Sequence, residues 1–204
     1  MNRVIFFIDG FNFYHSLMSE KRLHKFRWID YGKLVRLFVT SNDQIVEIIY
    51  FTSYAFWDQQ KQKKHKALID ALRLKGVNIV FGKFKMRDKK CRVCNSTYKI
   101  PEEKQTDINI AVKLLEKAIN DEFDTAILVT ADSDLVPAVE ALKKLFPAKR
   151  IGLLFPIGRS SIELENICDF KSRVKEKHLK SSQLPDSIVL DAKKGITLDK
   201  PSSW

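Results

Sequence analysis

The sequence has few cysteines and no long apolar run. Its 204 residues include three cysteines, too few for a disulfide framework, and this favours a reducing compartment. No apolar stretch approaches the roughly 20 residues that cross a bilayer. The apolar N-terminus is shorter than a signal peptide, and Asp9 interrupts it. We therefore predict a cytoplasmic protein with no membrane partner.

Acidic residues are fewer than basic residues. The chain has 25 Asp and Glu against 36 Lys and Arg, a formal net charge of +11. Such an excess favours a polyanionic partner such as nucleic acid, because lysines that neutralise phosphates release bound counterions. A basic protein with a merely solvated surface is the alternative.

Short apolar runs alternate with amphipathic stretches, which predicts an α/β fold. Strands are predicted at 4–8, 44–56, 77–86, 124–131 and 150–156, and helices at 11–20, 29–39, 58–75, 106–120, 133–146 and 160–167. This alternation is typical of a parallel central sheet with helices on both faces. The polar segment 87–105 is predicted to be an excursion or hairpin. We expect one domain over 1–180 and a C-terminal arm, 181–204, packed on it or loosely ordered.

Acidic side chains follow two of the predicted strands. Asp9 ends the run VIFFI, and Asp132 follows AILVT. Ligands of parallel α/β sheets bind outside the carboxyl ends of the strands, so these two acids can face one crevice. Asp107 opens the helix TDINIAVKLL, after a segment that can return to the same edge, and Asp134 lies two residues beyond Asp132.

Each of these acids also has a structural explanation. Asp132, Asp107 and Asp134 all suit the first turn of a helix. Asp9, followed by Gly-Phe-Asn, has no evident helix to cap. Clustered carboxylates repel one another, and a hard divalent cation relieves that repulsion. Mg²⁺ or Mn²⁺ at such a site supports phosphodiester hydrolysis.

Three motifs carry a resemblance to a known family. FFIDGFNFYHSL, EEKQTDINIAVKLL and LVTADSDLVPAVE stand in the order found in NYN-domain proteins, which are similar to the PIN-like nuclease superfamily. The resemblance spans residues 2 to about 170, and the tail resembles that of small stand-alone bacterial NYN proteins. It implies a PIN-like (Rossmann-like) three-layer α/β/α sandwich.

The resemblance also implies a site and an activity. Asp9, Asp107 and Asp132 would hold Mg²⁺ or Mn²⁺, with Asp134 beside them and Asn12 orienting a water or ligand oxygen. Many PIN nucleases carry a further Glu on an early helix, and no residue here can be assigned to that position, so the metal count stays open. The implied activity is that of a metal-dependent endoribonuclease.

Two other functions stay open. The first is a catalytically weak RNA-binding or regulatory module that keeps its acids for folding. The second is an oxidoreductase acting on a small aromatic, because one branch of the family is linked to hydroxylation of a pyridine compound. The sequence lacks the G-x-G-x-x-G fingerprint of a nucleotide cofactor, which counts against the second.

A basic segment precedes Asp107. Basic residues around an aromatic ring suit single-stranded or structured RNA, by phosphate pairing and base stacking. The segment carries Phe84 among Lys83, Lys85, Arg87, Lys89 and Lys90. Phe84 can equally be a core residue and the lysines a solvated surface, in which case the basic helix face at 61–66 is the next candidate.

Cys91 and Cys94 form a CxxC pair in this basic region. Structural zinc needs four ligands, and no second pair or suitably spaced histidine accompanies them, so we do not expect zinc within one chain. A pair shared across a homodimer, a redox pair, a relic of a zinc knuckle and a tight hairpin all stay open. Ser160 and Ser161, after Gly158-Arg159, predict either an ordinary helix cap or an anion-binding helix start.

Overall fold

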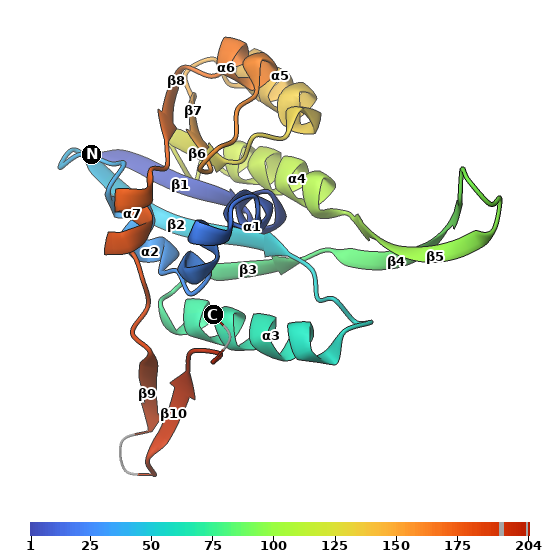
Figure 1. Cartoon of the computed structure of the whole chain (residues 1–204). Coiled ribbons are helices and arrows are strands. Elements are labelled where there is room, and N and C mark those ends of the chain that lie inside the picture. Colours follow the sequence, from blue (N-terminus) through green and yellow to red (C-terminus); the bar gives the residue numbers. More distant parts are fainter. Residues whose placement is uncertain (192–193, 203) are drawn as a thin grey trace.

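The computed structural model describes residues 1–191, 194–202 and 204, and its centre is a six-stranded sheet (Figure 1). Every pair of neighbouring strands in that sheet is parallel. The strands lie in the order β3 (Asn78–Phe81), β2 (Asp43–Thr52), β1 (Asn2–Asp9), β6 (Thr125–Val129), β7 (Arg150–Phe155) and β8 (Phe170–Arg173).

The central strand β1 is buried on both faces. Val4, Phe6 and Ile8 belong to one buried cluster, whereas Ile5 and Phe7 belong to the other. Successive side chains of a strand point to opposite faces, so an uninterrupted apolar run is what a sheet covered twice requires. The run VIFFI is therefore the sequence signature of this position.

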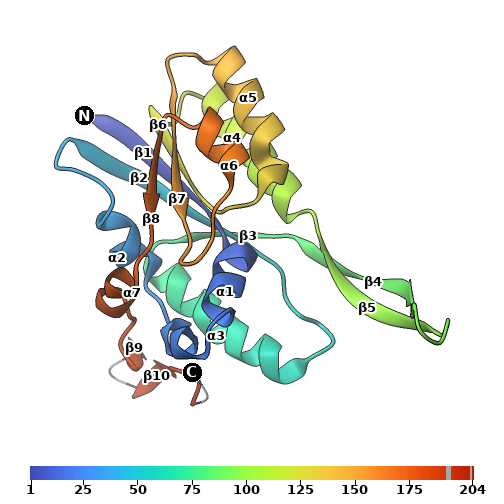
Figure 2. The same cartoon turned by 45° about the horizontal axis from the view of Figure 1, so that its top comes forward.

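Helices cover both faces and complete a three-layer α/β/α sandwich, as predicted (Figure 2). The first face carries α1 (Gly10–Met18), the 3₁₀ helix η1 (Lys21–Phe26), α2 (Tyr31–Arg36), α3 (Gln59–Leu74) and α7 (Glu176–Ser181). The second face carries α4 (Thr106–Ile119), α5 (Val136–Leu145) and α6 (Ile162–Ile167). A short 3₁₀ helix, η2 (Ser133–Leu135), precedes α5 where one longer helix was predicted.

The predicted strand over 77–86 is divided at Gly82. Its second half, β4 (Lys83–Lys90), leaves the sheet and pairs with β5 (Thr97–Lys104) in an antiparallel hairpin that projects from the domain (Figure 1). The hairpin alternative for 87–105 is thus confirmed. A Cβ on Gly82 would lie 2.7 Å from Ser53 Oγ and 2.8 Å from Glu103 Oε1, so glycine allows β5 to return close to the sheet.

The C-terminal segment contacts the domain at its two ends, and Ile188 and Leu198 between them pack against the core of the first face. Leu184 N donates to Trp28 O at 3.1 Å, and Trp28 Nε1 donates to Pro185 O at 2.8 Å. The ring of Trp204 packs edge-on against Trp28. Between these contacts lies a two-stranded sheet, β9 (Ser187–Asp191) with β10 (Ile196–Asp199). The domain boundary near residue 180 remains a prediction.

Within the part of the chain that the structure describes, no helix combines the length and the apolar character needed to traverse a bilayer.

Candidate metal centre

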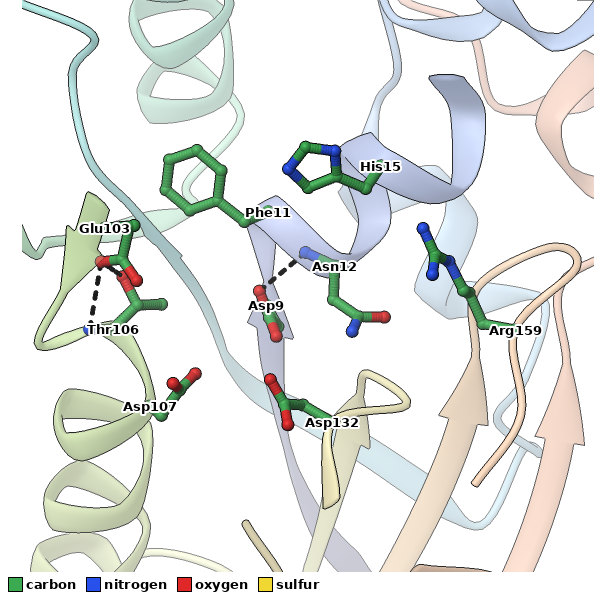
Figure 3. Close-up of a pocket in the computed structure, with 9 residues that line it drawn as sticks. All are labelled: Asp9, Phe11, Asn12, His15, Glu103, Thr106, Asp107, Asp132 and Arg159. Carbon is green, nitrogen blue, oxygen red and sulfur yellow. Dashed lines mark hydrogen bonds between the residues drawn. The ribbon is translucent and has the colours of Figure 1, made fainter. Parts of the chain in front are cut away.

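Three carboxylates meet at the carboxyl edge of the sheet. Asp9, Asp107 and Asp132 each place an oxygen within 4.8 Å of the others, on the wall of a cavity of about 340 Å³ (Figure 3). β1 and β6 are parallel neighbours with Ile8 opposite Val129, so their carboxyl ends bring Asp9 and Asp132 together. Asp107 arrives from the first turn of α4, which packs over the second face.

Asp9 caps α1, and the expectation that it had no helix to cap is wrong. Its Oδ1 accepts the Asn12 N–H at 2.9 Å, and its Oδ2 accepts the Thr130 hydroxyl at 3.0 Å. The side chain is nearly inaccessible, at 4% exposure. Burial raises the pKa of Asp9 to about 6, helped by the charges of Asp132 and Glu103 and opposed by the two hydrogen bonds.

Gly10 explains how a helix can begin immediately after the strand. A Cβ at this position would lie 2.6 Å from the backbone oxygen of Phe51 and 2.6 Å from Tyr50 Cζ. Only glycine permits α1 to lie this close to β2. The chain can therefore change direction directly after Asp9. The Asp-Gly pair of the sequence is therefore a packing requirement as well as a chemical one.

Asp107 is the acid that the fold leaves least satisfied. It lies two residues after the N-cap Gln105, a left-handed residue (φ 79°) whose side chain makes no cap hydrogen bond. Among the described residues, Asp107 itself has no hydrogen-bond or ion-pair partner. Burial raises the pKa of Asp107 to about 6, followed by repulsion from Asp132, Asp9, Glu103 and Asp134.

Asp132 combines the two roles that the sequence allowed. Its Oδ1 accepts the Asp134 N–H at 3.1 Å, so it does cap η2. Its own N–H donates to Thr130 Oγ1 at 3.1 Å, which joins it to the hydroxyl that also holds Asp9. Asp134 itself is exposed and does not line the cavity.

Asn12 ties α1 to the end of β6. Its Oδ1 accepts the Ala131 N–H at 3.2 Å, and the side chain lines the cavity beside the acids. The amide oxygen is therefore occupied. The amide nitrogen is the group that Asn12 can offer to a water or ligand oxygen.

Glu103 is a fourth acid on the cavity wall, and our sequence analysis gave it no role. It stands on β5, where its Oε1 accepts the Thr106 N–H at 3.3 Å, the Ser53 hydroxyl at 3.3 Å and the Thr106 hydroxyl. The signal for it was present in the motif EEKQTD, which puts this acid just ahead of α4. These hydrogen bonds link the base of the hairpin to the start of α4.

A positively charged side chain, that of Arg159, faces the acids from the other side of the cavity. Arg159 follows β7, a third strand ending at this edge, and no described residue gives its guanidinium a hydrogen bond or ion pair (Figure 3). His15 of α1 also lines the cavity, and burial together with Arg159 lowers its pKa. The sequence signal for Arg159 was the turn Gly158-Arg159, which follows a predicted strand. Nearby Ser161 is an ordinary cap of α6, accepting the Leu164 N–H at 3.3 Å.

None of the five basic residues proposed on β4 lines this cavity. Alternation places four of them on one face of the hairpin, Lys83, Lys85, Arg87 and Lys89. Lys90 lies on the opposite face with Phe84, which stands across from Glu103. Arg87 pairs with Glu102 at 3.2 Å. Substrate binding by these residues remains a prediction.

The CxxC pair lies at the tip of the hairpin. The Cys94 thiol is 3.0 Å from Ser96 Oγ, and hydrogen bonds from Ser96 and Cys91 lower the pKa of Cys94 to about 7. The described residues bring no third metal ligand to this pair, and Cys168 packs against the core of the second face. The zinc and redox alternatives for Cys91 and Cys94 remain predictions.

The chain belongs to the NYN-domain family. The family's sequence profile matches residues 3–173, which confirms the resemblance. A relative from Pseudomonas putida (strain DSM 28022 / S16), 6-hydroxy-3-succinoylpyridine 3-monooxygenase HspA, is 26% identical, covering 99% of this chain and 75% of the relative. The crystal structure of VPA0982, a protein of unknown function from Vibrio parahaemolyticus RIMD 2210633, matches with a TM-score of 0.61 at 18% identity. This match covers 90% of our chain and 96% of that one, and it supports the fold.

The donor set of the cavity suits a hard divalent cation. Its three converging groups are all carboxylates, and no Lys or Arg pairs with them in the described residues. Mg²⁺ and Mn²⁺ favour oxygen ligands of this kind. The Asp9–Asp107–Asp132 cluster is thus a site that could bind a metal ion.

Proposed function

We propose that this protein is a metal-dependent ribonuclease that hydrolyses RNA phosphodiester bonds at the Asp9–Asp107–Asp132 cluster. The observation that carries the proposal is the meeting of three carboxylates, without a basic partner among the described residues, opposite an unpaired arginine. Membership of the NYN family, with its resemblance to PIN-like nucleases, and the net charge of +11 support an RNA substrate.

Each side chain has a distinct role in this proposal. Asp9, Asp107 and Asp132 would hold Mg²⁺ or Mn²⁺, which when bound polarises a phosphoryl oxygen and activates water. Arg159 binds a non-bridging oxygen of the scissile phosphate and stabilises the charge that develops on it. The Asn12 amide nitrogen orients a water or phosphate oxygen, and Asp134 adds negative charge beside the cluster.

The raised pKa values of Asp9 and Asp107 fit this arrangement. Their carboxylates are held close together in a partly buried site where repulsion and burial disfavour the charged form. A cation reverses that balance, so metal binding releases protons and weakens as the pH falls below about 6. At pH 7 both carboxylates are largely ionised, and a bound cation would relieve the repulsion between them.

A second candidate function is oxidation of a small aromatic compound. The observation that favours it is the match over 99% of the chain to a protein named as a monooxygenase. Monooxygenation consumes O₂ and two electrons from a reductant, so it predicts oxygen uptake when 6-hydroxy-3-succinoylpyridine and a reductant are supplied. A third candidate is an RNA-binding module with little activity.

A cleavage assay, read beside RNA binding and oxygen uptake, separates these candidates. The protein is incubated with a mixed RNA pool in Mn²⁺, Mg²⁺ or EDTA, and a DNA pool of matched sequence tests the sugar preference. We expect metal-dependent cleavage that Asp107→Asn abolishes, because the change removes a proposed metal ligand. The variant should still fold, because Asp107 has no structural hydrogen bond to lose. Glu140→Gln, an exposed acid on α5, is the matched control and should cleave normally.

The other outcomes are equally informative. RNA binding without cleavage in either metal indicates the binding module. Oxygen uptake with the pyridine compound, in a protein that cleaves no RNA, indicates the monooxygenase. Cleavage that survives Asp107→Asn places the reaction away from this cluster and contradicts the proposal.

A further inference from the structure

Aromatic rings extend from the rim of the acid cavity onto the surface in one unbroken series. We call it the aromatic row, and it consists of His15, Phe11, Phe84, Trp57 and Phe56. Its members come from three segments that are far apart in the sequence, namely α1, the turn before α3 and the hairpin strand β4. His15 and Phe11 line the cavity itself (Figure 3).

Neighbouring rings of the row are in contact. The Phe11 and Phe84 ring centroids are 5.4 Å apart, those of Phe84 and Trp57 4.6 Å, and those of Trp57 and Phe56 5.3 Å. The three pairs meet at 82° to 90°, so each is edge-to-face. An edge-to-face pair covers a face of only one of its two rings, so the other ring keeps its faces free of that contact.

Packing of the domain accounts for only part of the row. Phe84 is half-buried between Phe11 and Trp57, where it attaches the hairpin to the domain. Trp57 is 39% exposed and Phe56 52% exposed, so neither ring completes the core. Contiguous exposed aromatic rings beside a candidate active site indicate a surface that another molecule covers.

The surroundings define the chemistry of that molecule. The protein carries a charge of +11, which favours a polyanion over an apolar peptide. Arg159 stands at the cavity end of the row, and Lys90 lies on the same face of β4 as Phe84. A polyanion that presents flat apolar rings at short intervals is a single-stranded nucleic acid. A duplex hides those faces inside its own stack.

We propose that the aromatic row is a base-stacking subsite for single-stranded nucleic acid. It takes the nucleotides next to the scissile phosphate on the side of hairpin β4–β5. The inference rests on the proposed function, since it supplies the strand path for that reaction. Its consequence is that a structured RNA is cut only beside an unpaired segment.

Binding measurements without cleavage test the row. Asp107→Asn serves as the background, and the probes are fluorescein-labelled 12-nucleotide oligouridylate and oligoadenylate, with a 12-base-pair RNA duplex for comparison. Because one stacked base contributes at least about fivefold in affinity, we expect Trp57→Ala and Phe56→Ala each to weaken single-strand binding about fivefold or more. Duplex binding should stay unchanged.

Two variants provide the controls. Trp57→Phe keeps a ring and should restore most of the lost affinity. Leu145→Ala removes an apolar side chain that is 63% exposed on α5, away from the row, and should bind like the background. Trp57 also supplies an optical signal, since Trp28 is fully buried and Trp204 packs against it. Stacking should quench the Trp57 emission, and Trp57→Phe should lack that quenching.

The possible failures are distinguishable. Single-strand affinity within twofold of the background in both alanine variants, with unchanged melting temperatures, overturns the proposal and leaves the row as a hairpin anchor. Equal weakening for strand and duplex overturns it as well, because stacking is then absent. If the row binds as expected but the unmodified protein cleaves no RNA, the proposed function fails and the subsite stands.

Discussion

The hydroxyl of Thr130 donates a hydrogen bond to Asp9 Oδ2 at 3.0 Å and thereby joins the ends of two neighbouring strands. The same hydroxyl oxygen accepts the Asp132 N–H at 3.1 Å. One buried side chain therefore positions two of the three clustered acids without being an acid itself. The carboxylate of Asp9 is thereby tied to the backbone of Asp132 at the neighbouring strand end.

Replacing Thr130 by valine should weaken the candidate metal site. The change preserves shape and removes the hydroxyl, and removal of such a supporting hydrogen bond typically costs 10- to 100-fold in metal affinity. We expect that decrease in a Mn²⁺ titration followed by calorimetry. Thr125→Val is the matched control, because Thr125 donates to Asn2 Oδ1 at 2.9 Å at the other end of β6. Equal Mn²⁺ affinity in the two variants would contradict the role given to Thr130.

Asp107 should make the stability of the metal-free protein depend on pH. Its pKa is raised to about 6 in the folded state, from 3.8, so folded protein takes up a proton that the unfolded chain does not. The stabilisation from this uptake is complete below about pH 4 and is lost as the pH rises through 6. We expect Asp107→Asn to be more stable at pH 7, by about 1 kcal/mol after allowance for screening of a half-exposed group.

Urea unfolding in EDTA between pH 4 and 7 checks this expectation. The advantage of Asp107→Asn should shrink towards zero at pH 4, where the native carboxyl is protonated. The comparison must be made between variants, because burial lowers the pKa of His65 to about 4 and gives the opposite slope in the same window. A difference between the two proteins that does not vary with pH would show that Asp107 is not desolvated.

Gly10→Ala should disturb the cluster through packing alone. The new Cβ would lie 2.6 Å from the Phe51 backbone oxygen, so α1 must shift, at a cost of about 1 to 3 kcal/mol. Because Asp9 caps α1, Mn²⁺ affinity should fall as well. Gly76→Ala is the control: its φ is +77° and no atom crowds it, so it should cost about 1 to 2 kcal/mol without affecting Mn²⁺.

The basic residues of hairpin strand β4 predict the salt dependence of RNA binding. Changing Lys83, Lys85, Arg87, Lys89 and Lys90 to alanine removes five charges, although Arg87 already pairs with Glu102. The slope of log affinity against log salt should become shallower, by about 0.7 for each single-strand phosphate that the protein no longer neutralises. Filter binding at several salt concentrations measures it. An unchanged slope would move the strand path elsewhere, with the helix face at 61–66 as the next candidate.

The central sheet could be predicted because each of its buried strands is marked by an apolar run in the sequence itself. VIFFI and AILV are apolar throughout, and such a run is typical of a strand buried on both faces. Acids at or shortly after the ends of these runs then indicated the edge where ligands bind. The site prediction followed from the order of strands and helices, and it needed no knowledge of side-chain contacts.

The rest depends on contacts between distant segments. Arg159 and Glu103 are ordinary charged residues in the sequence, and only the folded chain brings them to one cavity. Gly82 looked like part of a strand, because the crowding by Glu103 that requires glycine there comes from β5. The short edge strand β8, Phe170–Arg173, is mostly polar and exposed, so it lacks the pattern of a buried strand.

The position of β1 has a consequence for how the chain folds as it is made. The first strand of the sequence is the centre of the sheet, flanked by β2 on one side and β6 on the other. During synthesis β1 can pair with β2 early, but it stays open along its second edge until residues 125–129 emerge. Its apolar run is exposed to aggregation throughout that interval, and such distant pairings are slow to form. Translation pauses before residue 125 should therefore lower the yield of native protein more than pauses after it.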